Sequence, residues 1–157
     1  MNKLNQYKSL FFLLSLYIWL LPFLGCRSNS NNEAFSDLSA RDKMYFEQYM
    51  VQGQQLYKAR CSNCHQDNGR GLGRLIPPLD SADYLLNNMS RSACVIKYGL
   101  EGSILVNNVE YNQPMGPQQD LTDIEIAQIL TYIGNSWSNS AGFYPVKQVS
   151  QFLNNCK

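Results

Sequence analysis

The feature that most constrains this chain is the pentapeptide Cys61-Ser62-Asn63-Cys64-His65. Two thiols three residues apart can each add to one vinyl group of a haem, and the adjacent histidine can then bind the iron. This C-x-x-C-H spacing predicts covalent haem attachment through Cys61 and Cys64, with His65 as an iron ligand.

Two other kinds of site use the same cysteine spacing. A zinc site needs four ligands, usually including a second Cys or His pair, whereas Cys26, Cys94 and Cys156 are far apart in the sequence. A thioredoxin-like dithiol accompanies a βαβ pattern, and the sequence shows no such alternation. Haem attachment is therefore the favoured interpretation, with zinc binding and dithiol chemistry as the alternatives.

The first 25 residues are typical of an export signal. Two lysines precede an apolar run over residues 10–21, which is shorter than the roughly 20 apolar residues of a membrane-spanning helix. The run is followed by the letters FLGC at 23–26, which resemble a bacterial lipobox apart from the phenylalanine. We expect a lipoprotein signal peptide over residues 1–25 and lipidation of Cys26. The alternative is an ordinary signal peptide or a short anchor helix with an incidental cysteine.

The remaining chain divides into a polar segment and one domain. Residues 26–41 contain few apolar side chains and predict a flexible tether. Residues 42–157 are long enough for a single domain with a small core. The 13 Lys and Arg residues, two of which leave with the signal peptide, nearly balance the 12 Asp and Glu residues. This balance predicts no nucleic-acid partner.

Apolar residues at spacings of three and four predict a helix from Asp42 to Arg60. Gly53 lies on its apolar face, where glycine costs about 1 kcal/mol relative to alanine. Such a glycine suggests the close approach of another helix. Two short helices are expected over 81–89 and 90–98, each beginning at a serine suited to the N-cap.

A final helix is expected after the capping box Thr122-x-x-Glu125. Residues 66–80 and 100–120 lack helical periodicity, with a strand pattern only at 104–106. The tail is expected to be irregular or to form one further short helix. The predicted inner face of the final helix consists of Ile126, Ile129, Leu130, Ile133 and Trp137.

His65 is the only histidine in the chain, so a second iron ligand from this chain must be of another type. Methionine is the other common ligand in electron-transfer haem proteins. Met44 and Met50 lie on the helix that leads into the haem motif, and Met89 has no loop signature around it. Met115 lies in a Pro-Met-Gly-Pro segment fifty residues after His65. Met115 is therefore the predicted second ligand, and simple core packing is its alternative role.

Together these features resemble a class I cytochrome c over about residues 44–145. The resemblance rests on the approach helix with Gly53 and Tyr57, the C-x-x-C-H motif, the Pro78 region, the Met115 loop and the final helix. It implies an all-α, small cytochrome c fold, in which the first and last helices cross around one covalently attached haem c.

The resemblance also implies specific contacts. Gly53 and Tyr57 should meet Ile129 and Tyr132 where the two helices cross. A proline carbonyl should hold the second ring nitrogen of His65. Pro77 and Pro78 are both candidates for that carbonyl, and Pro78 is the cofactor-binding residue that we assign.

By the same resemblance, the expected function is that of an electron carrier and not of an enzyme. We expect a membrane-tethered monohaem c-type cytochrome that carries single electrons between respiratory redox proteins, with iron ligated by His65 and Met115. It should be lipid-anchored on the periplasmic side of a bacterial membrane and should have no small-molecule substrate. The alternatives are an electron-entry subunit of a larger dehydrogenase, reductase or oxidase, and a ligand-binding haem sensor.

Two cysteines remain once lipidation and haem attachment are assigned. Disulfides persist in an oxidising compartment, so Cys94 and Cys156 are expected to pair, two free thiols being the alternative.

Four basic residues lie close to the haem motif, although the whole chain is nearly neutral. They could orient an acidic partner toward the haem. They are Lys58, Arg60, Arg70 and Arg74.

Overall fold

The computed structural model describes residues 38–156, which contain six helices and one two-stranded hairpin. The predicted signal peptide, Cys26 and the tether up to residue 37 lie outside the described residues. Within residues 38–156, no helix has both the length and the apolar character needed to cross a membrane. The elements are α3 (Ala40–Arg60), α4 (Ser62–His65), α5 (Asp83–Leu86), α6 (Met89–Tyr98), β1 (Ile104–Val106), β2 (Val109–Tyr111), α7 (Asp123–Asn135) and α8 (Val146–Asn154).

The predicted approach helix is α3, which begins two residues earlier than expected. Ser39 caps it, because its side-chain oxygen accepts a hydrogen bond from the Asp42 backbone N–H at 3.1 Å. Its buried residues recur at intervals of three and four, as the sequence predicted, and so one face of the helix packs on the core. They are Phe46, Tyr49, Gly53 and Tyr57.

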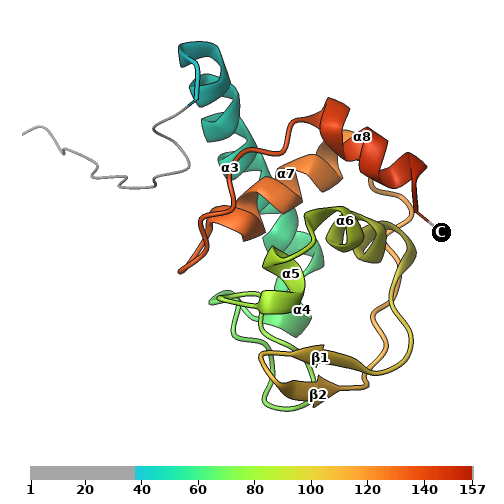
Figure 1. Ribbon diagram of the computed structural model, residues 1–157. Helices are drawn as coiled ribbons and strands as arrows, with labels where there is room; N and C mark the ends of the chain where they lie inside the picture. Colours follow the sequence, from blue (N-terminus) through green and yellow to red (C-terminus); the bar gives the residue numbers. More distant parts are fainter. Residues whose placement is uncertain (1–37, 157) are drawn as a thin grey trace, which may run out of the picture. The chain divides into compact units, whose positions relative to one another are not determined.

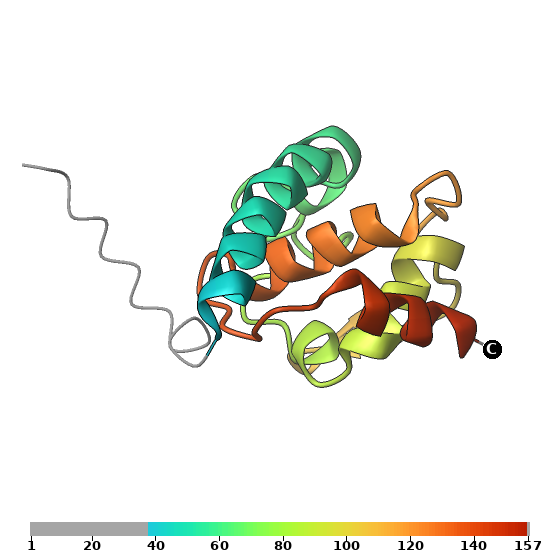
Figure 2. The ribbon, with the colours of Figure 1, turned by 90° about the horizontal axis from the view of Figure 1, so that it is seen from above.

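Helices α3 and α7 cross and pack together (Figures 1 and 2). The contact centres on Gly53, where an added Cβ would lie 2.1 Å from the Gln128 carbonyl oxygen and 2.7 Å from the Tyr132 Cβ. The predicted contact with Tyr132 is confirmed, and the closest contact of Gly53 is with Gln128, which the sequence did not predict. Residues 128 and 132 share one face of the helix, whereas Ile129 lies on the neighbouring face and is fully buried.

The start of α7 confirms the predicted capping box, whereas its end leaves Trp137 outside the helix. Its capping box is present, with the Glu125 carboxylate accepting hydrogen bonds from the Thr122 backbone N–H at 2.8 Å and from the Thr122 hydroxyl at 2.7 Å. The helix ends at Asn135, so the placement of Trp137 on its inner face is wrong. Trp137 has φ of 57°, outside helical geometry, and packs edge-on against Tyr57.

The two short helices begin at other residues than predicted. Asn88, not Ser90, caps α6, because its side-chain oxygen accepts a hydrogen bond from the Arg91 backbone N–H at 2.9 Å. Ser81 does not cap α5, since the helix begins after Ala82 and Ser81 has φ of 52°. Gly99 ends α6 as expected for a C-terminal glycine.

The expected strand at 104–106 has an antiparallel partner that the sequence analysis did not predict. Ile104 pairs with Tyr111 and Val106 with Val109. The two turn residues, Asn107 and Asn108, have φ of 50° and 62°, which is the left-handed geometry of a two-residue hairpin turn.

The tail forms the short helix α8, one of the two alternatives. It packs on α6 and α7 through the buried side chains of Val149 and Leu153. After the helix ends, Cys156 is joined to Cys94 of α6 by a disulfide, with 5.6 Å between their Cα atoms.

Candidate functional site

The haem motif lies in a single helical turn directly after α3. Cys61 is the N-cap residue of α4, and its carbonyl accepts hydrogen bonds from the backbone N–H groups of Cys64 at 3.1 Å and of His65 at 2.9 Å. Residues at i, i+3 and i+4 of a helical turn share one face. The turn therefore presents both thiols and the imidazole to the same side.

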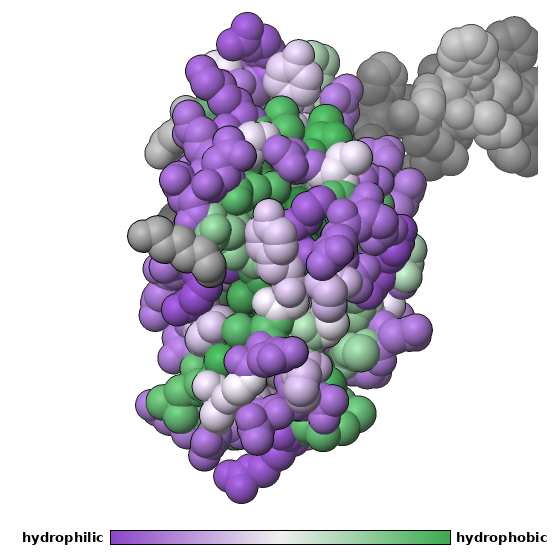
Figure 3. Space-filling view, turned by 90° about the vertical axis from the view of Figure 1, so that its right-hand side faces the viewer, coloured by the Kyte–Doolittle hydropathy of each residue, from purple (hydrophilic) through white to green (hydrophobic). Residues whose placement is uncertain are grey.

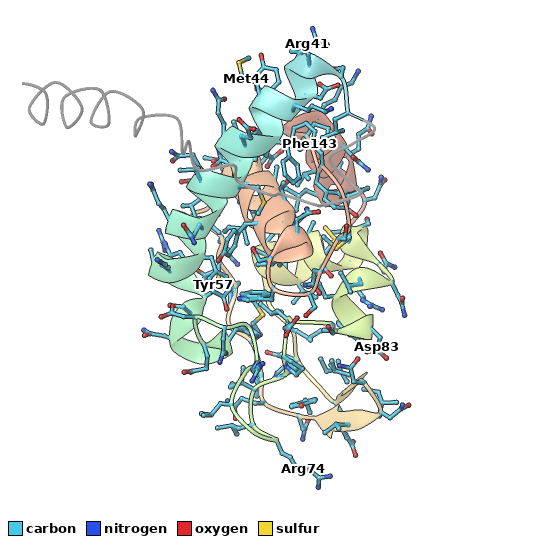
Figure 4. All side chains as sticks on the ribbon, turned by 90° about the vertical axis from the view of Figure 1, so that its left-hand side faces the viewer. Arg41, Met44, Tyr57, Arg74, Asp83 and Phe143 are labelled. Carbon is cyan, nitrogen blue, oxygen red and sulfur yellow. A yellow bond between two sulfur atoms is a disulfide. The ribbon has the colours of Figure 1, made fainter. Side chains whose placement is uncertain are left out.

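That side faces a cavity of about 230 Å³. Side chains from α3, α6, α7 and the hairpin close it, and Tyr57 reaches toward it from α3 (Figure 4). Most of the lining is apolar, including Leu85, Ile129 and Ile133. The predicted site residues on its wall are Cys61, Cys64, His65, Pro78 and Met115.

The imidazole of His65 is buried and held by one backbone carbonyl. Its Nδ1 lies 3.1 Å from the carbonyl oxygen of Pro77. Burial lowers the pKa of His65, although the Pro77 hydrogen bond opposes this shift. In the neutral tautomer that donates from Nδ1, the lone pair of Nε2 is left for a metal. The carbonyl assigned to Pro78 thus belongs to Pro77, and Pro78 lines the cavity.

A glycine allows the Pro77 carbonyl to come within hydrogen-bonding distance of His65. Gly71 has φ of 68°, and an added Cβ would lie 2.2 Å from the Ile76 carbonyl oxygen and 2.6 Å from that of Pro77. Its backbone N–H also donates to the carbonyl of His65 at 3.0 Å. No larger residue fits between the proline segment and His65 without moving one of them.

Asn139 supports the same loop and was not identified from the sequence. It is buried, and its amide nitrogen donates to the Leu79 carbonyl at 2.9 Å and the Ile133 carbonyl at 2.7 Å. Its amide oxygen accepts from the Ser81 backbone N–H at 2.8 Å. A single polar side chain therefore ties the end of α7 to the segment that follows the prolines, and an asparagine in a polar tail gives no sequence signal of this role.

Met115 lies on the segment between β2 and α7. Its backbone N–H donates to the Leu100 carbonyl, and its own carbonyl accepts from the Leu100 N–H, both at 2.9 Å. Of the methionines in residues 38–156, Met115 alone lines the cavity. The structure thus brings Met115 and His65 to one cavity.

The geometry disfavours both alternatives to haem. Within the described part of the chain, no three His, Cys, Asp or Glu residues are grouped as a metal site requires, and zinc would need four ligands. A reactive dithiol needs a thiol of lowered pKa, whereas burial raises the pKa of Cys61 to about 11.

The same residues fit a haem. Cys61 and Cys64 are free thiols at the cavity. His65 brings an imidazole and Met115 a thioether to its wall, and these are ligand types that electron-transfer haems use. A mostly apolar wall suits a porphyrin ring, which must be shielded from water.

The basic residues near the motif are not one free patch. Arg60 donates from its guanidinium to the Asp120 carboxylate at 2.6 Å, so its charge is compensated. Arg74 points away from the core at the lower edge of Figure 4. The four residues therefore do not contribute equally to a basic surface, and steering of an acidic partner by them stays a prediction.

Known proteins are similar to this chain in sequence. The cytochrome c family model matches residues 50–137. Two cytochromes c-552 from Thermus thermophilus are each 37% identical over 100 residues, which is 59% of this chain and 76% or 67% of the relative. The chain therefore belongs to the cytochrome c family, as a class I electron-carrying cytochrome with one covalently attached haem c.

Proposed function

We propose that this protein is a membrane-tethered cytochrome that passes single electrons between respiratory redox proteins on the periplasmic side of a bacterial membrane. In this proposal His65 and Met115 ligate the iron. The observation that carries it is the one apolar cavity whose wall contains both cysteines of the motif, His65 and Met115.

Each of the site residues would have a defined part in electron transfer. Cys61 and Cys64 hold the haem covalently, and the Pro77 carbonyl orients the imidazole of His65. When bound, the haem supplies the exchange of one electron between iron(III) and iron(II). His65 and Met115 would both be ligands of the iron, which would leave no position open for a substrate. The apolar wall disfavours the more highly charged oxidised iron and so raises its reduction potential.

The membrane attachment in this proposal depends on Cys26. Several acyl chains, at about 0.8 kcal/mol per buried methylene, would hold the domain at the lipid surface. Cys26→Ser should move the haem protein from the membrane fraction to the soluble fraction. A wild-type protein that is soluble without detergent would contradict the lipid anchor.

Exposed leucines offer a redox partner an apolar surface near the haem. Leu72 and Leu75 belong to the loop that contains the prolines, and Leu105 belongs to β1. Figure 3 shows hydrophobic groups at its lower edge between hydrophilic residues. An electron-transfer rate that falls with rising ionic strength would support charge steering by the remaining cations; an unchanged rate would support apolar docking.

Purification of the native protein from its own membrane is the decisive test. A free carrier should be isolated alone, with the absorption band in the far red that a low-spin iron with His and Met ligands gives. Isolation with a catalytic chain would support the alternative, in which this domain is the electron-entry subunit of a dehydrogenase, reductase or oxidase.

A further inference from the structure

The segment that carries Met115 is fixed at one side by its backbone. It contains no helix or strand between Tyr111 and Asp123, yet both backbone groups of Met115 are bonded to Leu100. Further along, the Gln118 N–H donates to the Ile96 carbonyl of α6 at 3.0 Å. These bonds hold the segment against the end of α6.

The far end of the segment is held by two cations from different elements. Arg60, at the end of α3, pairs with the Asp120 carboxylate at 2.6 Å. Lys97 of α6 donates from its ammonium group to the carbonyls of Gln119 at 2.8 Å and Leu121 at 2.5 Å. Both cations also lower the pKa of Asp120, the Arg60 hydrogen bond being the larger cause.

The ion pair between Arg60 and Asp120 connects two segments that lie on different sides of the cavity. Arg60 directly precedes Cys61, so it lies on the part of the chain that carries the His65 side of the site. Asp120 follows Met115 by five residues. The pair therefore joins the two sides of the haem cavity, whereas the backbone bonds of Met115 reach only Leu100, just after α6.

We infer that Arg60, Lys97 and Asp120 form a latch that keeps the Met115 segment closed over the haem. The inference rests on the proposed ligation of iron by Met115. A thioether is a soft, neutral ligand, so the oxidised iron holds it less firmly and its retention depends on where the segment is held. The three residues of the latch position the ligand and do not touch the iron.

Imidazole is a suitable probe, because it binds the oxidised iron only in molecules from which Met115 has moved away. In the full-length, haem-loaded protein, Asp120→Asn should raise the affinity for imidazole about two- to five-fold, the range expected for an exposed ion pair. Lys97→Met should also raise it. Asp120→Glu, which keeps the charge, should restore an affinity near that of the wild type.

Salt supplies a second readout that a general loss of stability would not reproduce. Added salt screens exposed charges, so it should raise the imidazole affinity of the wild type toward that of Asp120→Asn. The affinity of Asp120→Asn itself should change much less. The matched control is Glu101→Gln, which removes an exposed acid next to Leu100 and should leave the affinity unchanged.

Two results would overturn the latch, and they can be told apart. If Met115→Ala abolishes the low-spin spectrum while Asp120→Asn and Glu101→Gln both bind imidazole as the wild type does, the latch is wrong and the ligand assignment stands. If Met115→Ala keeps the wild-type spectrum, the ligand assignment fails and the latch fails with it. Asp120 is exposed, so its variants should fold, and their melting temperatures check this.

Discussion

Gly53 of α3 packs directly on the backbone of Gln128 of α7, where an added Cβ would lie 2.1 Å from the carbonyl oxygen. Real side chains do not approach a carbonyl so closely, and a backbone atom cannot turn aside as a side chain can. The crossing of the two helices therefore requires glycine at this position. The same crossing orients the end of α3, from which the haem motif follows.

Gly53→Ala should consequently destabilise the protein. Alanine gains about 1 kcal/mol in helix propensity, but overpacking at a rigid contact costs about 3 kcal/mol, and we expect a net loss of about 2 kcal/mol in the free energy of unfolding. Denaturant titration of the haem-loaded protein measures this loss.

Gly134→Ala in α7 is the matched control. Its added Cβ would lie 3.1 Å from the terminal methyl group of Met89 and 3.3 Å from the Ala141 Cβ. Because the Met89 side chain can move, the stability should change by less than about 1 kcal/mol. Equal losses in the two alanine variants would show that the Gln128 contact does not explain Gly53.

The sequence allowed the main helices to be predicted because each has a continuous local signal. The buried face of α3 repeats at intervals of three and four, and the capping box marks the start of α7. The second strand of the hairpin was missed because its turn is Asn107-Asn108. Asparagine tolerates the left-handed region, but the strongest hairpin signal places glycine second.

The same contrast holds for the site. The haem motif occupies five consecutive residues and was evident at once. The choice between Pro77 and Pro78 depends on which carbonyl turns toward His65, and spacing alone does not determine it. The pairing of Arg60 with Asp120 joins residues sixty positions apart, and exposed charges have no periodicity that would predict such a contact.

The disulfide between Cys94 and Cys156 should stabilise the domain. It closes a loop with a sequence separation of 62, and replacing both cysteines by serine should lower the free energy of unfolding by about 2–4 kcal/mol. Hydrogen exchange should quicken most in α8, which the bond holds on α6, and least at the crossing of α3 and α7.

A reductant distinguishes loss of the bond from other effects of the serines. It should destabilise the wild type to the level of the double variant and leave the double variant unchanged. Alkylation of both cysteines in the unreduced native protein would show that the bond is absent.

The capping box makes stability depend on pH. Hydrogen bonds from the Thr122 hydroxyl and backbone lower the pKa of Glu125 from its ordinary value of 4.5. A carboxylate with a lowered folded pKa stabilises the fold above its unfolded pKa, and this contribution is lost as the pH falls through the folded value. Glu125→Gln should therefore be less stable than the wild type at pH 7, and the difference should shrink below about pH 4.5.

Thr122→Ala removes the other half of the box and should cost about 1 kcal/mol at pH 7. Glu47→Gln, at an exposed position of α3, should stay within about 0.5 kcal/mol of the wild type at both pH values. A constant difference between Glu125→Gln and the wild type across the titration would mean that the carboxylate charge does not contribute through the cap.

Met115→Ala tests the second iron ligand. The thioether favours the reduced iron, so its loss should lower the reduction potential, by on the order of 0.1 V within the range that axial ligands span. The iron should become high-spin, while Cys61 and Cys64 keep the haem in place. Absorption spectra of both oxidation states and a redox titration measure these changes.

The other methionines of the domain provide controls of two kinds. Met44 is 51% exposed, and Met44→Ala should change neither the spectrum nor the stability appreciably. Met89 is buried, so Met89→Ala should cost about 2–5 kcal/mol of stability and still keep the low-spin spectrum. Met50→Ala should behave in the same way with a smaller loss. If Met115→Ala stays low-spin at unchanged potential while one of these three variants becomes high-spin, that methionine is the ligand, and a shared cavity wall is not sufficient to identify it.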